Sequence, residues 1–96
     1  MLKVMTVFGT RPEAIKMAPI CRLLRQRPDD FQTCVVLTAQ HRHMLDQVMA
    51  LFQITSNHDL DIMQQNQTLD YILSQVVTRL TPILDLEKPD IVLVHG

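Results

Sequence analysis

The residues best suited to chemistry lie in the loop over 9–13, Gly-Thr-Arg-Pro-Glu, which follows an apolar strand pattern and opens a helix pattern. A glycine lets a ligand approach the backbone closely, and the first turn of a helix offers N–H groups that favour an anion. Arg11 adds a forked donor suited to phosphate, and Lys16 adds a second cation. The expected phosphate-binding residues are Gly9, Thr10, Arg11 and Lys16.

The same loop permits a plainer interpretation, in which Arg11 and Lys16 pair with Glu13 on the helix surface. Lys16 follows Glu13 by three residues, which is a suitable spacing for a helical ion pair. The loop has too few glycines for the GxGxxG dinucleotide fingerprint, and the GxxxxGK[ST] pattern of a P-loop is absent from the sequence. Nicotinamide-dependent enzymes and P-loop NTPases are therefore disfavoured.

Two further polar groups follow apolar strand patterns. Gln40, His41 and His43 come after the second pattern, and His95 and Gly96 come after the last one. Ligands of open parallel sheets bind at the carboxyl ends of the strands, so both groups could meet a ligand, with His95 and Gly96 at the floor of the cleft. The plainer alternatives are that His41 and His43 are loop or helix-capping residues and that His95 only fills space.

We expect no metal site and no catalytic residue within these 96 residues. His41, His43 and Asp46 are the nearest approach to a ligand set, but their spacing matches no common zinc pattern. His58 lies in a polar segment and is expected to be solvated. The carboxylates, Glu87 among them, are expected away from the strand ends, where they form no acid/base pair, and no cofactor is implied.

Composition narrows the class of protein. The net charge is −1, the chain is 47% hydrophobic, and no basic cluster exceeds two residues, so nucleic acid is an unexpected partner. No apolar stretch approaches the ~20 residues of a membrane span. Cys21 and Cys34 form no CxxC pair, and we expect both to fill the core as free thiols in the cytoplasm.

Strand patterns alternate with helix patterns, which predicts an α/β fold with a parallel Rossmann-like sheet and flanking helices. The predicted strands cover residues 2–8, 31–38 and 91–95, with a short strand over 59–63. Thr10 and Glu13 should form a capping box, Thr68 should cap the third helix, and Pro82 should kink or interrupt its last turn. The third helix carries the clearest apolar stripe, expected in the core: Leu69, Ile72, Leu73, Val76, Val77, Leu80, Ile83 and Leu84.

The last strand, over 91–95, is apolar on both faces and should therefore be central in a sheet. No later strand follows to cover its far edge, and an exposed apolar edge favours association. We therefore expect residues 1–96 to be part of an N-terminal Rossmann-like domain, with a second domain absent.

Four segments resemble the non-hydrolysing UDP-N-acetylglucosamine 2-epimerases of bacteria: residues 6–19, 38–42, 44–48 and 88–96. The strings GTRPEAIK and TAQHR are the most specific of these. The resemblance implies a glycosyltransferase-B-type fold of two domains and an isomerase that converts UDP-N-acetylglucosamine to UDP-N-acetylmannosamine for surface polysaccharide. It also implies a homodimer.

The resemblance assigns roles to particular residues. Arg11 and Lys16 match family positions associated with the UDP portion of the substrate, and Gln40 and His41 match a loop linked to a second, activating UDP-N-acetylglucosamine. The alternatives from other classes are a glycosyltransferase of the same fold and a non-catalytic module that binds nucleotide sugar.

Overall fold

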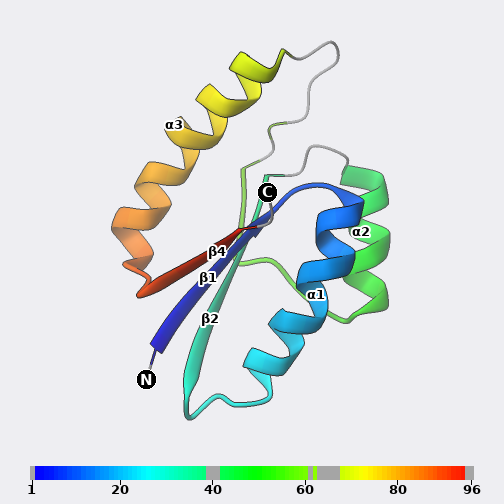
Figure 1. Cartoon of the computed structure of the whole chain (residues 1–96), viewed down its shortest axis with the longest axis vertical. Helices are drawn as coiled ribbons and strands as arrows, with labels where there is room; N and C mark the ends of the chain where they lie inside the picture. The colour runs from blue at the N-terminus through cyan, green and yellow to red at the C-terminus, as the bar shows by residue number, and fades with distance from the viewer. Residues whose placement is uncertain (1, 39–41, 61, 63–67, 95–96) are drawn as a thin grey trace.

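The computed structural model describes residues 2–38, 42–60, 62 and 68–94, with the backbone alone for residues 42–44. The elements alternate along the chain (Figure 1). In order they are β1 (Leu2–Phe8), α1 (Arg11–Arg25), β2 (Phe31–Leu37), α2 (Arg42–Leu51), β3 (His58–Asp59), α3 (Leu69–Glu87) and β4 (Ile91–Val94). The four strands are parallel, in the order β3-β2-β1-β4, which confirms the predicted α/β fold.

The register brings the carboxyl ends of the three longer strands to one edge of the sheet. Phe8 pairs with Leu37 at the end of β1, and Val7 pairs with Val94 of β4. Figure 1 shows α1 and α2 on one side of this sheet and α3 on the other. Two layers of helices therefore cover the sheet, and the loop after β1 begins at its carboxyl edge.

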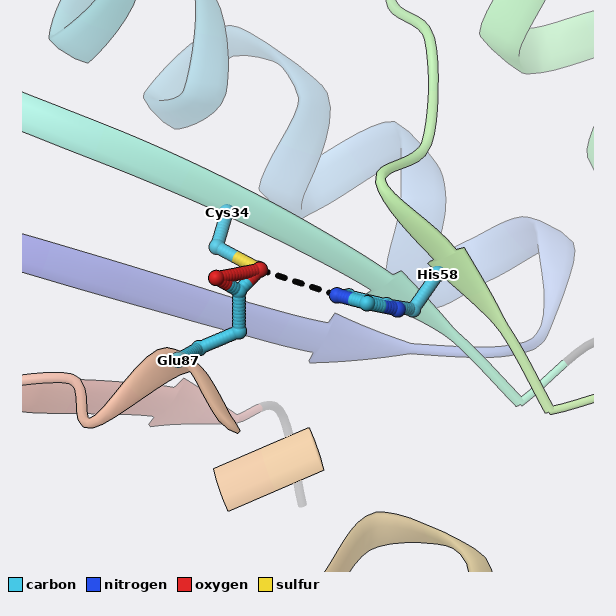
Figure 2. Close-up of side chains that lie close together, drawn as sticks. All are labelled: Cys34, His58 and Glu87. Carbon is cyan, nitrogen blue, oxygen red and sulfur yellow. Dashed lines mark hydrogen bonds and ion pairs between the residues drawn. The ribbon is translucent and has the colours of Figure 1, made fainter. Parts of the chain in front are cut away.

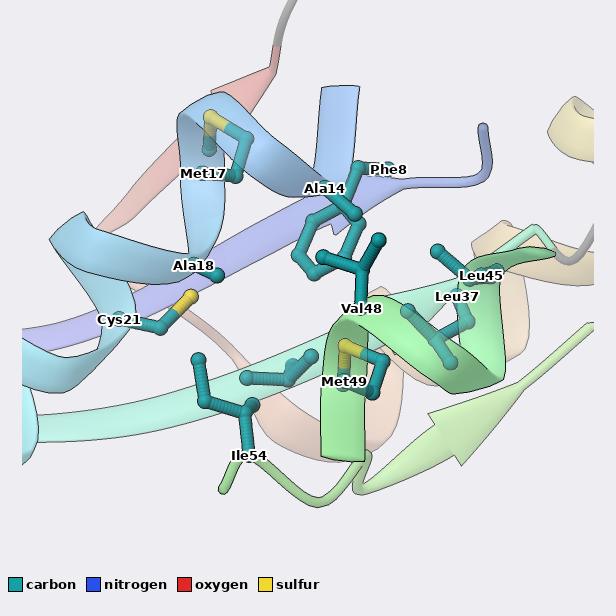
Figure 3. Packing of buried hydrophobic residues seen from close by; sticks show 11 residues of the cluster. Phe8, Ala14, Met17, Ala18, Cys21, Leu37, Leu45, Val48, Met49 and Ile54 are labelled. Carbon is teal, nitrogen blue, oxygen red and sulfur yellow. The ribbon is translucent and has the colours of Figure 1, made fainter. Parts of the chain in front are cut away.

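The larger core cluster lies between the sheet and the first two helices (Figure 3). Its members on β1 and β2 include Phe8, Val35 and Leu37, and all are buried. The buried face of α1 is the predicted one, because the apolar residues recur at helical spacing: Ala14, Met17, Ala18 and Cys21. Helix α2 adds Leu45, Val48 and Met49.

The opposite face of the sheet carries a smaller cluster under α3. It contains Met5, Val7, Cys34, Val36, Leu60 and Ile62. Helix α3 packs on it through partly buried side chains, and none of the described residues of α3 is fully buried. The prediction of a core stripe was therefore wrong for the outer part of the stripe, where Leu69, Leu73 and Val77 are 79%, 62% and 58% exposed. Sequence periodicity identifies an apolar face but not what covers it.

Both predicted helix starts are confirmed. Thr10 and Glu13 form the capping box of α1, and the Thr68 hydroxyl accepts the Tyr71 N–H at 3.1 Å. Pro82 was predicted to kink or interrupt α3, and the interruption does not occur, because the helix continues to Glu87. Ile83 and Leu84 pack on the smaller cluster beyond the proline, and this packing outweighs the lost N–H donor.

One strand differs from the prediction, and another has the exposed edge that was predicted. The short strand is His58–Asp59 and not the segment over 59–63. β4 is an edge strand of the described sheet, and Ile91, Val92 and Val94 are 42%, 41% and 67% exposed. Among the described residues, the apolar run of β4 is therefore uncovered on its outer side.

Candidate functional site

The loop after β1 is held by the carboxylate of Glu13. Its Oε1 atom accepts the N–H of Gly9 at 3.3 Å, the N–H of Thr10 at 3.0 Å and the hydroxyl of Thr10 at 2.8 Å. Gly9 itself is buried, and its φ angle is not positive. Two of the N–H groups expected to face an anion are thus already bonded within the chain.

The two cations, Arg11 and Lys16, lie at different positions on α1. Arg11 is the first residue of α1, at the carboxyl end of β1, and Lys16 lies further along the same helix. Both are exposed, and within the described part of the chain neither forms an ion pair with Glu13. The plainer interpretation of surface pairing with Glu13 therefore finds no support. An anion at the start of α1 would be met by side-chain cations and the helix dipole more than by the loop N–H groups.

The other predicted site residues are only partly covered by the structure. Gln40, His41, His95 and Gly96 lie outside the described residues. His43 belongs to the first turn of α2, and its side chain is outside the described part.

A second polar cluster lies under the end of α3, and the sequence did not predict it (Figure 2). Glu87, the last residue of α3, has one carboxylate oxygen 2.9 Å from His58 Nε2, and the Cys34 thiol donates to the same oxygen at 3.4 Å. Its other oxygen accepts from Lys3 Nζ at 2.9 Å. The expectation of a solvated His58 was wrong, because β3 places this imidazole beside the carboxylate.

Electrostatics in this cluster shift two pKa values in opposite directions. The hydrogen bond from His58, followed by that from Lys3, lowers the pKa of Glu87 to about 2. Burial, followed by the hydrogen bond to the Glu87 carboxylate, raises the pKa of Cys34 to about 11. The thiol therefore keeps its proton at neutral pH and donates it to a charged carboxylate. Cys21, on the other face, also has a raised pKa because it is buried.

Sequence reasoning missed the cluster because its members are far apart in the chain and share no motif. Met5 pairs with Cys34, and Val36 pairs with His58, so alternate residues of neighbouring strands share one face. Only this register and the length of α3 bring Glu87 to them. The sequence held one signal for the cluster: Cys34 and Val36 are two residues apart on a predicted strand and therefore face the same side of the sheet.

A parallel sheet covered on both faces, with a cationic loop at the carboxyl end of its first strand, defines a Rossmann-like α/β domain. The family described as UDP-N-acetylglucosamine 2-epimerase matches residues 22–96. This chain belongs to that family.

Similar proteins agree with this assignment over nearly the whole chain. UDP-N-acetylglucosamine 2-epimerases from Yersinia pestis and Escherichia coli K12 are 55% and 56% identical over 95 residues, which is 99% of this chain. The chain spans about a quarter, 25%, of the length of these relatives.

Solved structures of similar proteins support the same family assignment. The UDP-GlcNAc 2-epimerase of Neisseria meningitidis bound to UDP-GlcNAc matches with a TM-score of 0.89 and 53% identity, over 99% of this chain and 26% of that one. The S. aureus MnaA-UDP co-structure matches with a TM-score of 0.89 and 51% identity, over 100% and 25%. The neighbours have the glycosyltransferase-B-like fold, so that prediction is confirmed. Among the described helices, none is long and apolar enough to cross a membrane.

Proposed function

We propose that the protein carrying these residues is a UDP-N-acetylglucosamine 2-epimerase that interconverts UDP-N-acetylglucosamine and UDP-N-acetylmannosamine. The observation that carries the proposal is family membership over residues 22–96, joined to an exposed Arg11 at the start of α1. Related proteins of known structure were solved with UDP-GlcNAc or with UDP. The proposed substrate is therefore the same nucleotide sugar.

The reaction has two halves. In the first, a base removes the proton at C2 while the C1–O bond to UDP breaks, which leaves a glycal-type intermediate and free UDP. In the second, UDP returns to C1 and a proton is delivered to C2 from the other face. Charge develops on the leaving diphosphate, so cations that hold it lower the barrier.

Arg11 and Lys16 are the residues that we assign to the diphosphate. Arg11 can form two parallel N–H···O bonds, and Lys16 acts as a point charge. Glu13 fixes Gly9 and Thr10 just before α1, the helix that carries both cations, so Gly9 and Thr10 would line the substrate site. His95 and Gly96 would form the cleft floor, and Gln40, His41 and His43 would serve an activator site.

The proposal extends to the assembly and the setting. Residues 1–96 would be part of the N-terminal domain of a two-domain protein, and we expect the acid/base groups elsewhere in that protein. A homodimer and a cytoplasmic location, with product directed to surface polysaccharide, follow the family resemblance. Nucleic acid and membrane are not among the proposed partners.

The test is proton NMR of UDP-N-acetylglucosamine in deuterated water with the complete protein in which these residues occur. We expect UDP-N-acetylmannosamine to appear with deuterium at C2. Residues 1–96 alone, at the same concentration, should give no turnover.

Two results would overturn the proposal. Transfer of the sugar to an added acceptor, with no epimer formed, would identify a glycosyltransferase. Unchanged substrate that nevertheless binds the protein would identify a non-catalytic module. Epimer formed by residues 1–96 alone would refute the expectation that the acid/base groups lie elsewhere.

A further inference from the structure

The cluster at the end of α3 joins three donor types from three elements. The Cys34 sulfur comes from β2, the His58 imidazole from β3 and the Glu87 carboxylate from α3. One atom of each lies within 4.8 Å of one atom of each of the others, and Figure 2 shows the three side chains pointing toward one another. The donors are therefore gathered by the fold and not by one loop.

We propose that Cys34, His58 and Glu87 bind a Zn²⁺ ion, with water at the fourth position. Sulfur, imidazole nitrogen and carboxylate oxygen are the zinc ligands of proteins, whereas Mg²⁺ and Ca²⁺ require oxygen donors. The ion would link β2, β3 and α3 to one another, so the proposal does not depend on the epimerase activity.

The spacing of the donor atoms suits a tetrahedral ion. Zinc bond lengths place neighbouring ligand atoms roughly 3.3–3.6 Å apart. Here the carboxylate oxygen is 2.9 Å from His58 Nε2 and 3.4 Å from Cys34 Sγ. Small side-chain movements would make room for the ion if they lengthened the distance between the carboxylate oxygen and His58 Nε2 and kept the distance to Cys34 Sγ.

The two carboxylate oxygens of Glu87 have different partners, and this leaves one of them to bind a metal ion. Oε1 faces Lys3 Nζ at 2.9 Å, whereas Oε2 faces both His58 and Cys34. Lys3 thus acts as an outer partner that orients the carboxylate, as partners of metal ligands commonly do. Oε2 remains the oxygen directed at the proposed ion.

Exposure and charge are also consistent with a bound cation. Cys34 is 2% exposed, whereas the side chains of His58 and Glu87 are 25% and 22% exposed, which gives solvent access to one side. Once binding has displaced the proton of the Cys34 thiol, the thiolate and the Glu87 carboxylate beside Lys3 carry a net charge of −1 toward the divalent ion. Binding must displace the thiol proton of Cys34, so affinity should rise with pH.

The test uses Co²⁺ as a spectroscopic probe and Zn²⁺ as its competitor, with the complete protein. We expect one equivalent of Co²⁺ to give a thiolate-to-cobalt charge-transfer band that Zn²⁺ abolishes. The Cys34→Ser variant should lose this band. Cys21→Ser is the matched control, because Cys21 is also buried but lies on the other face, beside Thr6, and should keep the band.

Two further variants keep the test decisive if Cys34→Ser fails to fold. Glu87→Gln and His58→Gln change partly exposed side chains, and each should weaken Co²⁺ binding by at least about tenfold. Asp85→Asn, at an exposed position on the same helix, should leave the affinity unchanged. The proposal is refuted by the absence of a charge-transfer band in the wild type, by a band that survives Cys34→Ser, or by unaltered affinity in both Glu87→Gln and His58→Gln.

Discussion

At the scale of single residues, Glu87 is the shared partner in the polar cluster at the end of α3. Its carboxylate connects Lys3, Cys34 and His58, which lie on three different strands. Hydrogen bonds from His58 and Lys3 favour the charged form of this carboxylate and outweigh the opposing effect of burial, so they are the physical reason for the lowered pKa of Glu87. The charged Glu87 carboxylate therefore holds the end of α3 against the sheet, and protonation at low pH will weaken this contact.

The Glu87→Gln variant tests this tie through the pH dependence of unfolding, measured with a chelator present. The pKa of Glu87 falls from an ordinary 4.5 to about 2 in the folded state, so the unfolded state binds more protons between these values. The wild type should hold this stabilisation above about pH 4.5 and lose it as the pH falls toward 2. Glu87→Gln should show a smaller slope in this window.

Asp85→Asn is the control, because Asp85 is exposed on the same helix and outside the cluster. It should retain the wild-type dependence on pH. Identical slopes for the wild type and Glu87→Gln would contradict the assigned role of the carboxylate.

At the scale of elements, α3 ends with Lys88 in a left-handed conformation. Its φ is 48° and its N–H donates to the carbonyl of Leu84 at 2.9 Å, and Pro89 follows. A residue with a Cβ atom is disfavoured in this region, whereas glycine is not. Lys88 therefore occupies a helix end at which glycine would be the more favourable residue.

Lys88→Gly should raise the free energy of unfolding, by about 0.5–1 kcal/mol, because it relieves the left-handed strain. Chemical denaturation followed by circular dichroism measures the change. Lys88→Ala removes the same side-chain charge but keeps a Cβ atom, so it should give no such gain. Equal effects from both substitutions would show that charge, not backbone conformation, is responsible.

The elements also show which structural features a sequence can predict. β1, β2 and the buried face of α1 were predicted correctly because an apolar run or a helical spacing of apolar residues marks a buried element whichever part of the chain covers it. Of the two effects predicted for Pro82, interruption of the helix does not occur, because the packing of Ile83 and Leu84 overrides the local propensity. The Cys34, His58 and Glu87 cluster was missed because it depends on register, which no local pattern encodes.

At the scale of the whole molecule, apolar surface remains exposed on β4 and on the outer side of α3. The most exposed residue of β4 is Val94, at 67%, and Leu73 and Leu86 of α3 are 62% and 71% exposed. An unpaired parallel strand offers both apolar side chains and backbone hydrogen-bonding groups to another chain. The 96-residue chain by itself should therefore associate as its concentration rises.

Analytical ultracentrifugation of residues 1–96 measures this association. Val94→Lys should move the transition to higher concentration, because a charge on an edge strand opposes pairing. Ile15→Lys, at a position on α1 that is 46% exposed, is the matched control and should behave as the wild type does. A wild-type chain that stays monomeric at every concentration would contradict this prediction.

The central claim is that the loop after β1 presents Arg11 to the diphosphate of the substrate. The most direct test compares kcat/KM for epimerisation of UDP-N-acetylglucosamine by the complete protein in two variants, Arg11→Ala and Arg22→Ala. Arg22 is the control, because it is exposed at the other end of the same helix. Loss of a charged hydrogen-bonding partner should lower kcat/KM roughly ten- to a hundredfold in Arg11→Ala, with little change in Arg22→Ala. Equal activity in Arg11→Ala and the wild type would contradict the assignment.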